Sequence, residues 1–166
     1  NLGGGFPARY TAGVSDLATY ASTIQAAVRE HLAPFGPRVV IEPGRGLVGD
    51  AGKIVTRVVL VSQRDPSGPR WVYLDIGKFG GLAETMDESM KYRIRAMPAL
   101  GGPEGPVVLA GPTCDSADIL YERTLYRLPL ALREGDYLEI LSAGAYTSSY
   151  ASVGFNGFAP LATYFV

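Results

Sequence analysis

The chain has 166 residues, of which 47% are hydrophobic and 19% charged, and its formal net charge at pH 7 is −1. This composition is typical of a globular protein, and the length suffices for one core or two small ones. The charge gives no basic field for nucleic acid, and no apolar run approaches the roughly 18 residues of a membrane span. One cysteine allows no internal disulfide, so we expect a cytoplasmic protein.

The first fifty residues have the pattern of a βα repeat. Asn1-Leu2 is typical of the end of a buried strand and runs into the glycine turn Gly3–Gly5, so we expect the chain to begin within a fold. Apolar residues recur at helical spacing from Ser15 to Leu32, with Ser15 as the candidate N-cap. A short β-branched run at residues 38–41 then leads into a loop. This order predicts the closing part of a βα repeat.

The pattern changes near Gly52, where we place a domain boundary. Two strands, Ile54–Val61 and Trp71–Ile76, flank a polar turn and are expected to pair as a hairpin. Further strands are predicted at residues 91–97, 107–110, 124–130, 137–141 and 161–166. The sequence therefore predicts an α/β part over residues 1–52 and a mostly antiparallel β domain over residues 53–166.

Two loops before the boundary carry groups suited to an anionic ligand. Backbone N–H groups of Gly3–Gly5 can approach an anion closely because no Cβ intervenes, although most triple glycines are only turns. In the other loop, Pro43 and Gly44 fix a bend between Glu42 and Arg45. The ordinary interpretation is a structural salt bridge. In the functional one, Arg45 holds a phosphate and Glu42 keeps a ring nitrogen protonated.

The only cysteine, Cys114, lies in a polar loop between predicted strands. A lone cysteine is usually a small buried hydrophobe, but this loop favours chemistry. The only histidine, His31, is expected on the helix surface, which argues against a Cys–His nucleophile pair and a metal site. Tyr146 lies in a glycine-rich stretch, where an aromatic ring belongs to the core by default.

Three acidic residues form a modest set: Asp87, Glu88 and Asp115. Solvated surface carboxylates are the ordinary interpretation of each one. Taken with the phosphate-binding groups, the thiol and the phenol, they suit a phosphorylated cofactor and a charged amino-acid substrate.

In this order the motifs resemble the C-terminal half of the ornithine/lysine decarboxylase group. These are pyridoxal-phosphate enzymes of the alanine-racemase-like fold, related to diaminopimelate and arginine decarboxylases. The likeness covers essentially all of the chain through Gly-Gly-Gly-Phe-Pro, Glu-Pro-Gly-Arg, Gly-Pro-Thr-Cys-Asp-Ser-Ala-Asp, Gly-Asp-Tyr, Gly-Ala-Tyr-Thr and Phe-Asn-Gly-Phe. Asp115, where the diaminopimelate enzymes typically carry glutamate, and the Phe155–Phe158 ending favour the diamine-forming branch. Residues Trp71–Phe79 are similar to the bacterial bifunctional lysine/ornithine type.

The resemblance implies a role for each matched residue and an architecture for the whole. Glu42 would meet the pyridine nitrogen, Cys114 would return a proton to the α-carbon after carbon dioxide leaves, and a basic amino acid would be bound through its distal ammonium. The ammonium ligands would be Asp87, Glu88 and Asp115, and the phosphate ligands Gly4, Gly5, Gly44, Arg45 and Tyr146. The resemblance also implies a homodimer with shared active sites. The fold would be the last strands of a (β/α)8 barrel followed by a β-sandwich or β-barrel domain.

One group that the family requires has no counterpart in these motifs. The Schiff-base lysine of the family lies on an early barrel strand, upstream of the matched segment, whereas the lysines here are Lys53, Lys78 and Lys91. We therefore expect a portion of an enzyme that forms putrescine or cadaverine, inactive alone and dependent on a companion chain with the missing half.

Other interpretations stay open. A portion of a diaminopimelate decarboxylase is disfavoured by Asp115, and a non-catalytic regulatory homologue would be expected to lose Cys114 or Glu42. An unrelated β-rich binding module would make the motifs a coincidence. Ornithine and lysine differ by one methylene, worth about 1–3 kcal/mol in a pocket, so the sequence predicts either substrate.

Overall fold

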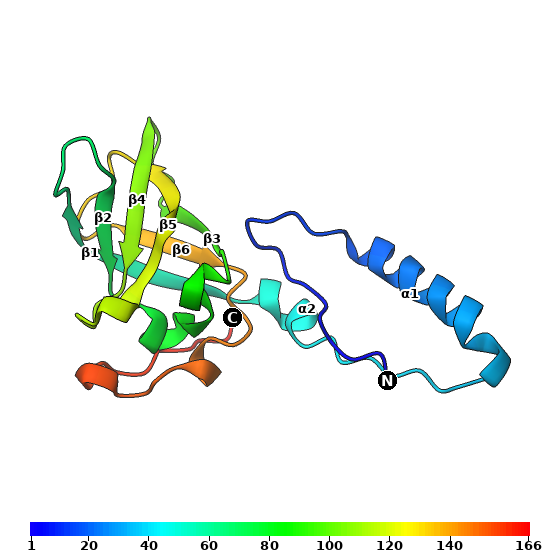
Figure 1. The fold of residues 1–166 in the computed structure, drawn as a ribbon. Coiled ribbons are helices and arrows are strands. Elements are labelled where there is room, and N and C mark those ends of the chain that lie inside the picture. Colours follow the sequence, from blue (N-terminus) through cyan, green and yellow to red (C-terminus); the bar gives the residue numbers. More distant parts are fainter.

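The computed structural model describes all residues from Asn1 to Val166, and six of its segments form one curled sheet (Figure 1). The strands are β1 (Lys53–Ser62), β2 (Arg70–Leu74), β3 (Arg93–Met97), β4 (Glu104–Ala110), β5 (Ile119–Pro129) and β6 (Tyr137–Leu141). Their order in the sheet is β3-β6-β1-β2-β4-β5. Every neighbouring pair is antiparallel except β2 and β4, which are parallel. The sheet is therefore a mixed half-barrel, and the alternative prediction of a β-sandwich is wrong.

The long strand β1 makes the sheet curl because its two halves pair with different neighbours. Residues 53–57 pair with β6, and the strand pairs with β2 from Val58 onward. The register shifts between Val58 and Leu60, where an irregularity of this kind bends a strand. The predicted hairpin between the first two strands is confirmed.

Alternation along β1 separates a buried face from an open one. Ile54, Thr56 and Val58 are buried, whereas the residues between them are exposed, as the period of a half-buried strand requires. Ile54 and Val58 belong to a core of 16 buried residues, which begins at Ile54 and ends at Ala143. The sheet and its connections therefore supply the whole core.

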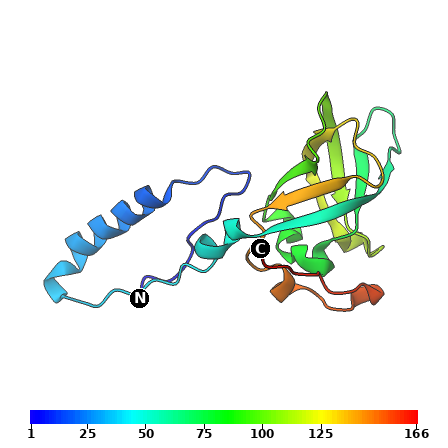
Figure 2. The same cartoon turned by 180° about the vertical axis from the view of Figure 1, so that it is seen from behind.

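The helix α1 (Leu17–His31) lies away from the sheet, at the far end of the molecule (Figures 1 and 2). Its N-cap is Asp16 and not the predicted Ser15: the backbone N–H of Thr19 donates to the Asp16 carboxylate at 2.7 Å. None of its residues is buried, so the apolar face that periodicity predicted is open. No helix of the chain is both long and apolar enough to cross a lipid bilayer.

Two extended segments flank α1 and lie side by side. The N–H of Leu2 donates to the carbonyl of Val40 at 2.9 Å. In turn, the N–H of Glu42 donates to the carbonyl of Gly3 at 2.8 Å. Both segments run in the same direction, but the predicted strand at residues 38–41 joins no sheet, because this short stretch is its only neighbour. The short helix α2 (Arg45–Val48) then leads into β1.

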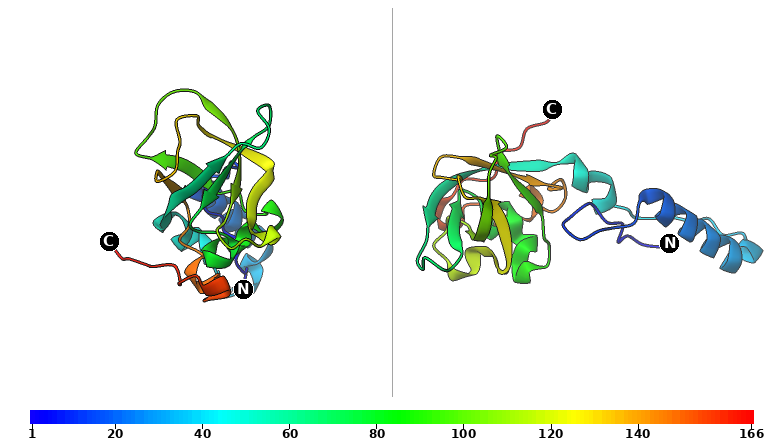
Figure 3. Two further views of the ribbon diagram at one scale, coloured as in Figure 1. Left: turned by 90° about the vertical axis from the view of Figure 1, so that its left-hand side faces the viewer. Right: turned by 90° about the horizontal axis from the view of Figure 1, so that it is seen from above.

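After β6 the chain crosses beneath the sheet and then leaves it (Figures 1 and 3). Two hydrogen bonds hold this crossing: the N–H of Ser152 donates to the Phe79 carbonyl, and the Asn156 amide donates to the Thr113 carbonyl, each at 2.9 Å. The strand predicted at residues 161–166 is wrong. Its backbone groups find no partner strand, and the last three side chains are exposed.

Candidate active site

Four segments that are distant in the sequence meet around one cavity. The glycine turn, the loop before α2, the turn after β6 and the segment that follows β2 all contribute to its wall. The lining includes all six residues predicted to hold a cofactor: Gly4, Gly5, Glu42, Gly44, Arg45 and Tyr146. It also includes residues that the sequence did not single out, among them Tyr10, Glu84 and Tyr150.

Glycine is required where two of these loops touch. A Cβ on Gly4 would lie 2.6 Å from the carbonyl oxygen of Glu42, closer than atoms can approach. Gly5 and Gly44 have φ angles of 84° and 31°, a region of backbone conformation that glycine adopts without strain. The motif glycines thus let two backbones form one wall of the cavity.

Arg45 is the central charged group of the cavity and is held from one side. Its Nη1 donates to Glu84 Oε2 at 2.7 Å and to the Tyr10 hydroxyl at 2.8 Å, and its Nη2 donates to Glu84 Oε1 at 2.5 Å. The hydrogen bond to Glu84 outweighs burial and raises the pKa of Arg45 above its ordinary value. The guanidinium is therefore a permanent cation in a fixed orientation.

Tyr146 lies against the same guanidinium. The Arg45 Cζ atom is 4.9 Å from the centroid of the Tyr146 ring, a cation–π distance. The Tyr146 hydroxyl would lie 3.9 Å from a Cβ on Gly44, so the phenol borders the glycine loop as well. Tyr146 is half exposed, which makes it part of the cavity wall and not of the core.

Glu42 is also exposed at the cavity. One carboxylate oxygen, Oε1, accepts a hydrogen bond from the side-chain amide of Asn1 at 2.5 Å. Oε2 has no hydrogen-bond partner in the structure. The carboxylate is thus open to a further donor.

Cys114 and Asp115 do not line this cavity. Both are exposed; the Cys114 thiol makes only a 4.0 Å contact with the Pro112 carbonyl, and Asp115 accepts the N–H of Ala117 at 2.8 Å. Within one chain, therefore, the structure does not bring the predicted proton donor to Arg45.

The adjacent acids Asp87 and Glu88 have different environments. Asp87 is exposed and its carboxylate makes no hydrogen bond, whereas the buried Glu88 accepts three consecutive N–H groups of β5 at 2.7–2.8 Å. Burial alone would raise the pKa of Glu88, but these hydrogen bonds outweigh it and lower the pKa to about 2. The carboxylate fastens its segment to β5, which argues against the predicted contact between Glu88 and a substrate ammonium.

Several of these residues share an unusual backbone conformation. Six non-glycine residues have positive φ, and four of them are predicted site residues: Asp87, Glu88, Cys114 and Tyr146. Such conformations cost about 1–3 kcal/mol each and gather at functional sites. At Asp87, Cys114 and Tyr146 the conformation therefore favours a functional position on grounds independent of the motifs, whereas at Glu88 the carboxylate is already bound to β5.

A comparison with known families decides what this arrangement belongs to. The family described as "pyridoxal-dependent decarboxylase, C-terminal sheet domain" matches residues 14–144. The chain belongs to this family. The predicted resemblance and the pyridoxal cofactor of the family are thereby confirmed.

Individual relatives include decarboxylases of two substrate types. The diaminopimelate decarboxylase of Staphylococcus aureus (strain COL) is 32% identical over 160 residues, 92% of this chain and 36% of that protein. The lysine/ornithine decarboxylase of Selenomonas ruminantium is 33% identical over 159 residues, 95% of this chain and 38% of that protein. The structure of a Vibrio vulnificus lysine/ornithine decarboxylase complexed with cadaverine matches with a TM-score of 0.80 and 35% identity, over 95% of this chain and 41% of that one. The chain thus spans about two fifths of the length of these relatives.

The cavity of this decarboxylase domain fits a phosphorylated cofactor. The glycine loops place backbone at the wall of the cavity, and Arg45 keeps N–H donors that no protein group accepts. Amide donors, a guanidinium and a phenol are the groups that bind a phosphate dianion.

None of the three lysines lines the cavity. The Lys53 ammonium pairs with Glu139 at 2.5 Å, that of Lys91 donates to the Glu88 carbonyl at 2.8 Å, and Lys78 is buried. None of the three ammonium groups is thus available at the Arg45 cavity.

Sequence reasoning missed Glu84 and Tyr10 at this site. Glu84 belongs to an acidic stretch that looks like solvated surface, and Tyr10 lies in a segment with no periodic pattern. Only the folded chain shows that both contact Arg45. No signal in the sequence distinguished Glu84 from its neighbours Asp87 and Glu88.

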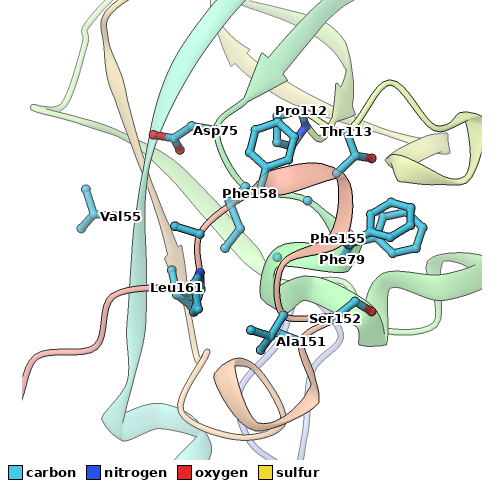
Figure 4. A pocket seen from close by; sticks show the side chains of 16 residues that line it. Val55, Asp75, Phe79, Pro112, Thr113, Ala151, Ser152, Phe155, Phe158 and Leu161 are labelled. Carbon is cyan, nitrogen blue, oxygen red and sulfur yellow. The ribbon is translucent and has the colours of Figure 1, made fainter.

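A second, apolar cavity of about 170 Å³ lies under the C-terminal crossing (Figure 4). Phe79 and Phe155 stack at its side with ring centroids 4.2 Å apart. Asp75 lies on its wall, but its carboxylate already accepts the Thr56 hydroxyl at 2.6 Å and the Arg57 N–H at 2.9 Å. The stacked rings at its side join the C-terminal crossing to the segment that follows β2.

Proposed function

We propose that the chain is the C-terminal portion of a pyridoxal-phosphate-dependent decarboxylase that converts lysine or ornithine to the corresponding diamine. The observation that carries this proposal is the convergence of Gly4, Gly44, Arg45 and Tyr146 on one cavity. Membership of a pyridoxal-dependent decarboxylase family supports the reaction class.

Different residues of the cavity would bind different parts of the cofactor. Arg45, the glycine loops and Tyr146 would hold the phosphate, and Glu42 would favour the protonated ring nitrogen, since an opposite charge stabilises a cation. When bound, pyridoxal phosphate supplies the sink for the electron pair that remains after carbon dioxide departs. The open oxygen of Glu42 and the fixed charge of Arg45 support this division.

Residues 1–52 would form the closing part of a (β/α)8 barrel, and residues 53–166 the β domain. The parallel pairing of the two extended segments, the glycine turn after the first and the open apolar face of α1 support this division. The start of β1 at Lys53 agrees with a boundary near Gly52.

The complete active site would be shared between two copies of the chain in a homodimer. Because Cys114 and Asp115 lie outside their own Arg45 cavity, they would serve the cavity of the partner. There Cys114 would donate its thiol proton to the α-carbon after carbon dioxide leaves, and Asp115, with Asp87, would bind the distal ammonium. Their exposure supports this assignment.

The substrate would be a basic amino acid with one carboxylate. Two observations support this choice. Position 115 carries aspartate, as expected for the diamine-forming branch, and the chain is similar to a lysine/ornithine decarboxylase complexed with cadaverine. Diaminopimelate is the second candidate, because a diaminopimelate decarboxylase is 32% identical to the chain. Carbon dioxide release from lysine, ornithine and meso-diaminopimelate, measured side by side, distinguishes the two.

The proposal is tested on the chain together with the segment that carries the cofactor-binding lysine, in one polypeptide or as a companion chain. Borohydride should then fix pyridoxal phosphate covalently, and lysine or ornithine should release carbon dioxide and the diamine. Glu42→Ala should retain the cofactor and lose most turnover, whereas Arg45→Ala should lose affinity for the cofactor. Covalent fixation on Lys53, Lys78 or Lys91 of the chain alone would contradict the proposal.

Shared sites are tested by mixing two inactive variants, Cys114→Ala and Glu42→Ala. If each site takes Cys114 from one copy and Glu42 from the other, random mixed dimers contain one intact site, and activity should return to about a quarter of the wild type. Mixing that restores no activity would place both residues in a site within one chain.

A further inference from the structure

We propose that Glu84 is a positioning residue for Arg45: its carboxylate, together with the Tyr10 hydroxyl, fixes the guanidinium so that its free edge faces the cofactor phosphate. This inference rests on the proposed function, because it takes Arg45 as the phosphate ligand. It adds a residue that no motif in the sequence had indicated.

The hydrogen bonds of the guanidinium define which edge is free. An arginine side chain has five N–H donors in one plane. Nη1 uses both of its protons, on Glu84 and Tyr10, and Nη2 uses one on Glu84. The donors that remain, on Nε and on Nη2, lie along a single edge, and the structure gives them no other partner. Two parallel donors on one edge suit a phosphate.

The group that holds Arg45 is itself rigidly supported. The side chains of Arg45 and Glu84 are only 20% and 16% exposed. The Glu84 carbonyl accepts the N–H of Met90 at 3.0 Å, and the same segment is fastened to β5 by Glu88. An arginine that its neighbours already hold in the binding orientation loses less orientational freedom when a phosphate binds to it.

Tyr10 is supported in the same way. Its ring packs edge-on against Tyr92 at 5.4 Å, and the N–H of the next residue, Thr11, donates to the Lys91 carbonyl at 3.0 Å. Tyr10, like Arg45, belongs to the residues before β1 but packs on Tyr92 of the sheet domain, whereas Glu84 belongs to the sheet domain itself. The contact joins the two regions that build the cavity.

The sign of the effect separates positioning from simple charge. As a negative charge alone, Glu84 would repel a phosphate, and its removal would strengthen phosphate binding. As a positioning residue, it would hold two donors in place, and its removal would weaken binding even though the net charge becomes more favourable. The two roles thus predict opposite changes in affinity.

The test measures the affinity of pyridoxal phosphate, by fluorescence titration, for the complete enzyme that contains the chain and the lysine-bearing segment. Glu84→Ala should weaken binding about tenfold, the scale seen when groups that orient a ligand are removed. Glu84→Gln, whose amide oxygen can still accept from Arg45, should lose about threefold or less, and so should Tyr10→Phe. Pyridoxal, which has no phosphate, should bind all variants with similar affinity.

A double-mutant cycle shows whether Glu84 acts through Arg45. In an Arg45→Ala background, Glu84→Ala should cause no further loss of affinity. Glu134→Ala is the matched control, because Glu134 is exposed and makes no side-chain hydrogen bond. The unfolding temperature of each variant shows that it is folded.

Three results would overturn the inference while leaving the proposed function intact: unchanged or tighter binding in Glu84→Ala, an equal loss for pyridoxal, or a loss that persists without Arg45. A wild-type enzyme with no affinity for pyridoxal phosphate would instead refute the proposed function, and the inference with it.

Discussion

The sheet and the fifty residues before it differ in how they bury apolar surface. All 16 core residues lie between Ile54 and Ala143, whereas the region before β1 has only Ala8 and Gly49 buried, and α1 has no buried residue. Most helical stability in proteins comes from packing an apolar face. The sheet is therefore stabilised by its own core, whereas the stability of the first region depends on what covers its apolar face.

The cavity lies at the junction of these two regions. Arg45 comes from the first and Glu84 from the segment between β2 and β3, and Asp50 adds a second link by accepting the Ser142 hydroxyl at 2.6 Å. At Gly144 the two regions touch so closely that a Cβ would overlap the Val48 carbonyl. One wall of the cavity therefore belongs to the packed sheet domain and the other to a region with few buried residues.

The comparison is tested most strongly by removing matched apolar side chains. Leu138 is fully buried in the sheet, so Leu138→Ala should lower the free energy of unfolding by about 2–5 kcal/mol. Leu17 on α1 is 76% exposed, so Leu17→Ala should change it by less than about 0.5 kcal/mol. Urea unfolding followed by near-ultraviolet circular dichroism measures both.

Equal losses of unfolding free energy in the two variants would contradict this difference, because they would show that α1 packs as tightly as the sheet. If Leu17→Ala becomes destabilising only when the lysine-bearing segment is present, that segment covers the apolar face of α1.

Sequence patterns predicted what depends on local alternation and missed what depends on distant partners. The β1–β2 hairpin follows from a β-branched run and the polar turn after it, and β6 from a short strand-like stretch; both predictions are confirmed. The strand at residues 161–166 had the same local pattern but no neighbour to pair with. Likewise, nothing local predicts the parallel pairing of β2 with β4.

The residues of the cavity show the same distinction between what the sequence indicated and what only the folded chain reveals. The family resemblance implied that Arg45 and Tyr146 hold the same group, and the structure has them in cation–π contact. Glu84 and Glu88 could not be told from surface acids, because their roles arise only when the folded segment meets Arg45 and the N–H groups of β5. A carboxylate in an acidic stretch acquires its function from the fold around it.

The second test concerns Glu88, whose carboxylate fastens the segment of Glu84 to the sheet. Its pKa is lowered from the ordinary 4.5 to about 2, so the ionised carboxylate stabilises the fold above about pH 4.5 and loses this contribution as the pH falls toward 2. Glu88→Gln should therefore cost about 2–3 kcal/mol at neutral pH and progressively less in acid. Urea unfolding from pH 7 to pH 3 measures the trend.

Asp87→Asn is the control for Glu88, since it removes the adjacent charge from an exposed side chain that makes no hydrogen bond. It should change the free energy of unfolding by less than about 0.5 kcal/mol. Similar losses in the two variants would mean that the segment is held by general charge and not by the three N–H groups of β5.

The smallest expected effect is at the start of α1, where two neighbouring residues compete as the cap. The Asp16 carboxylate accepts the N–H of Thr19, and this hydrogen bond lowers the pKa of Asp16. Asp16→Ala should reduce the far-ultraviolet helical signal, and the wild type should lose the same signal as Asp16 becomes protonated in acid. Because α1 shares no core with the sheet, the urea midpoint of the sheet should stay unchanged. Ser15→Ala should alter neither signal, and a fall in helicity in that variant would restore Ser15 as the cap.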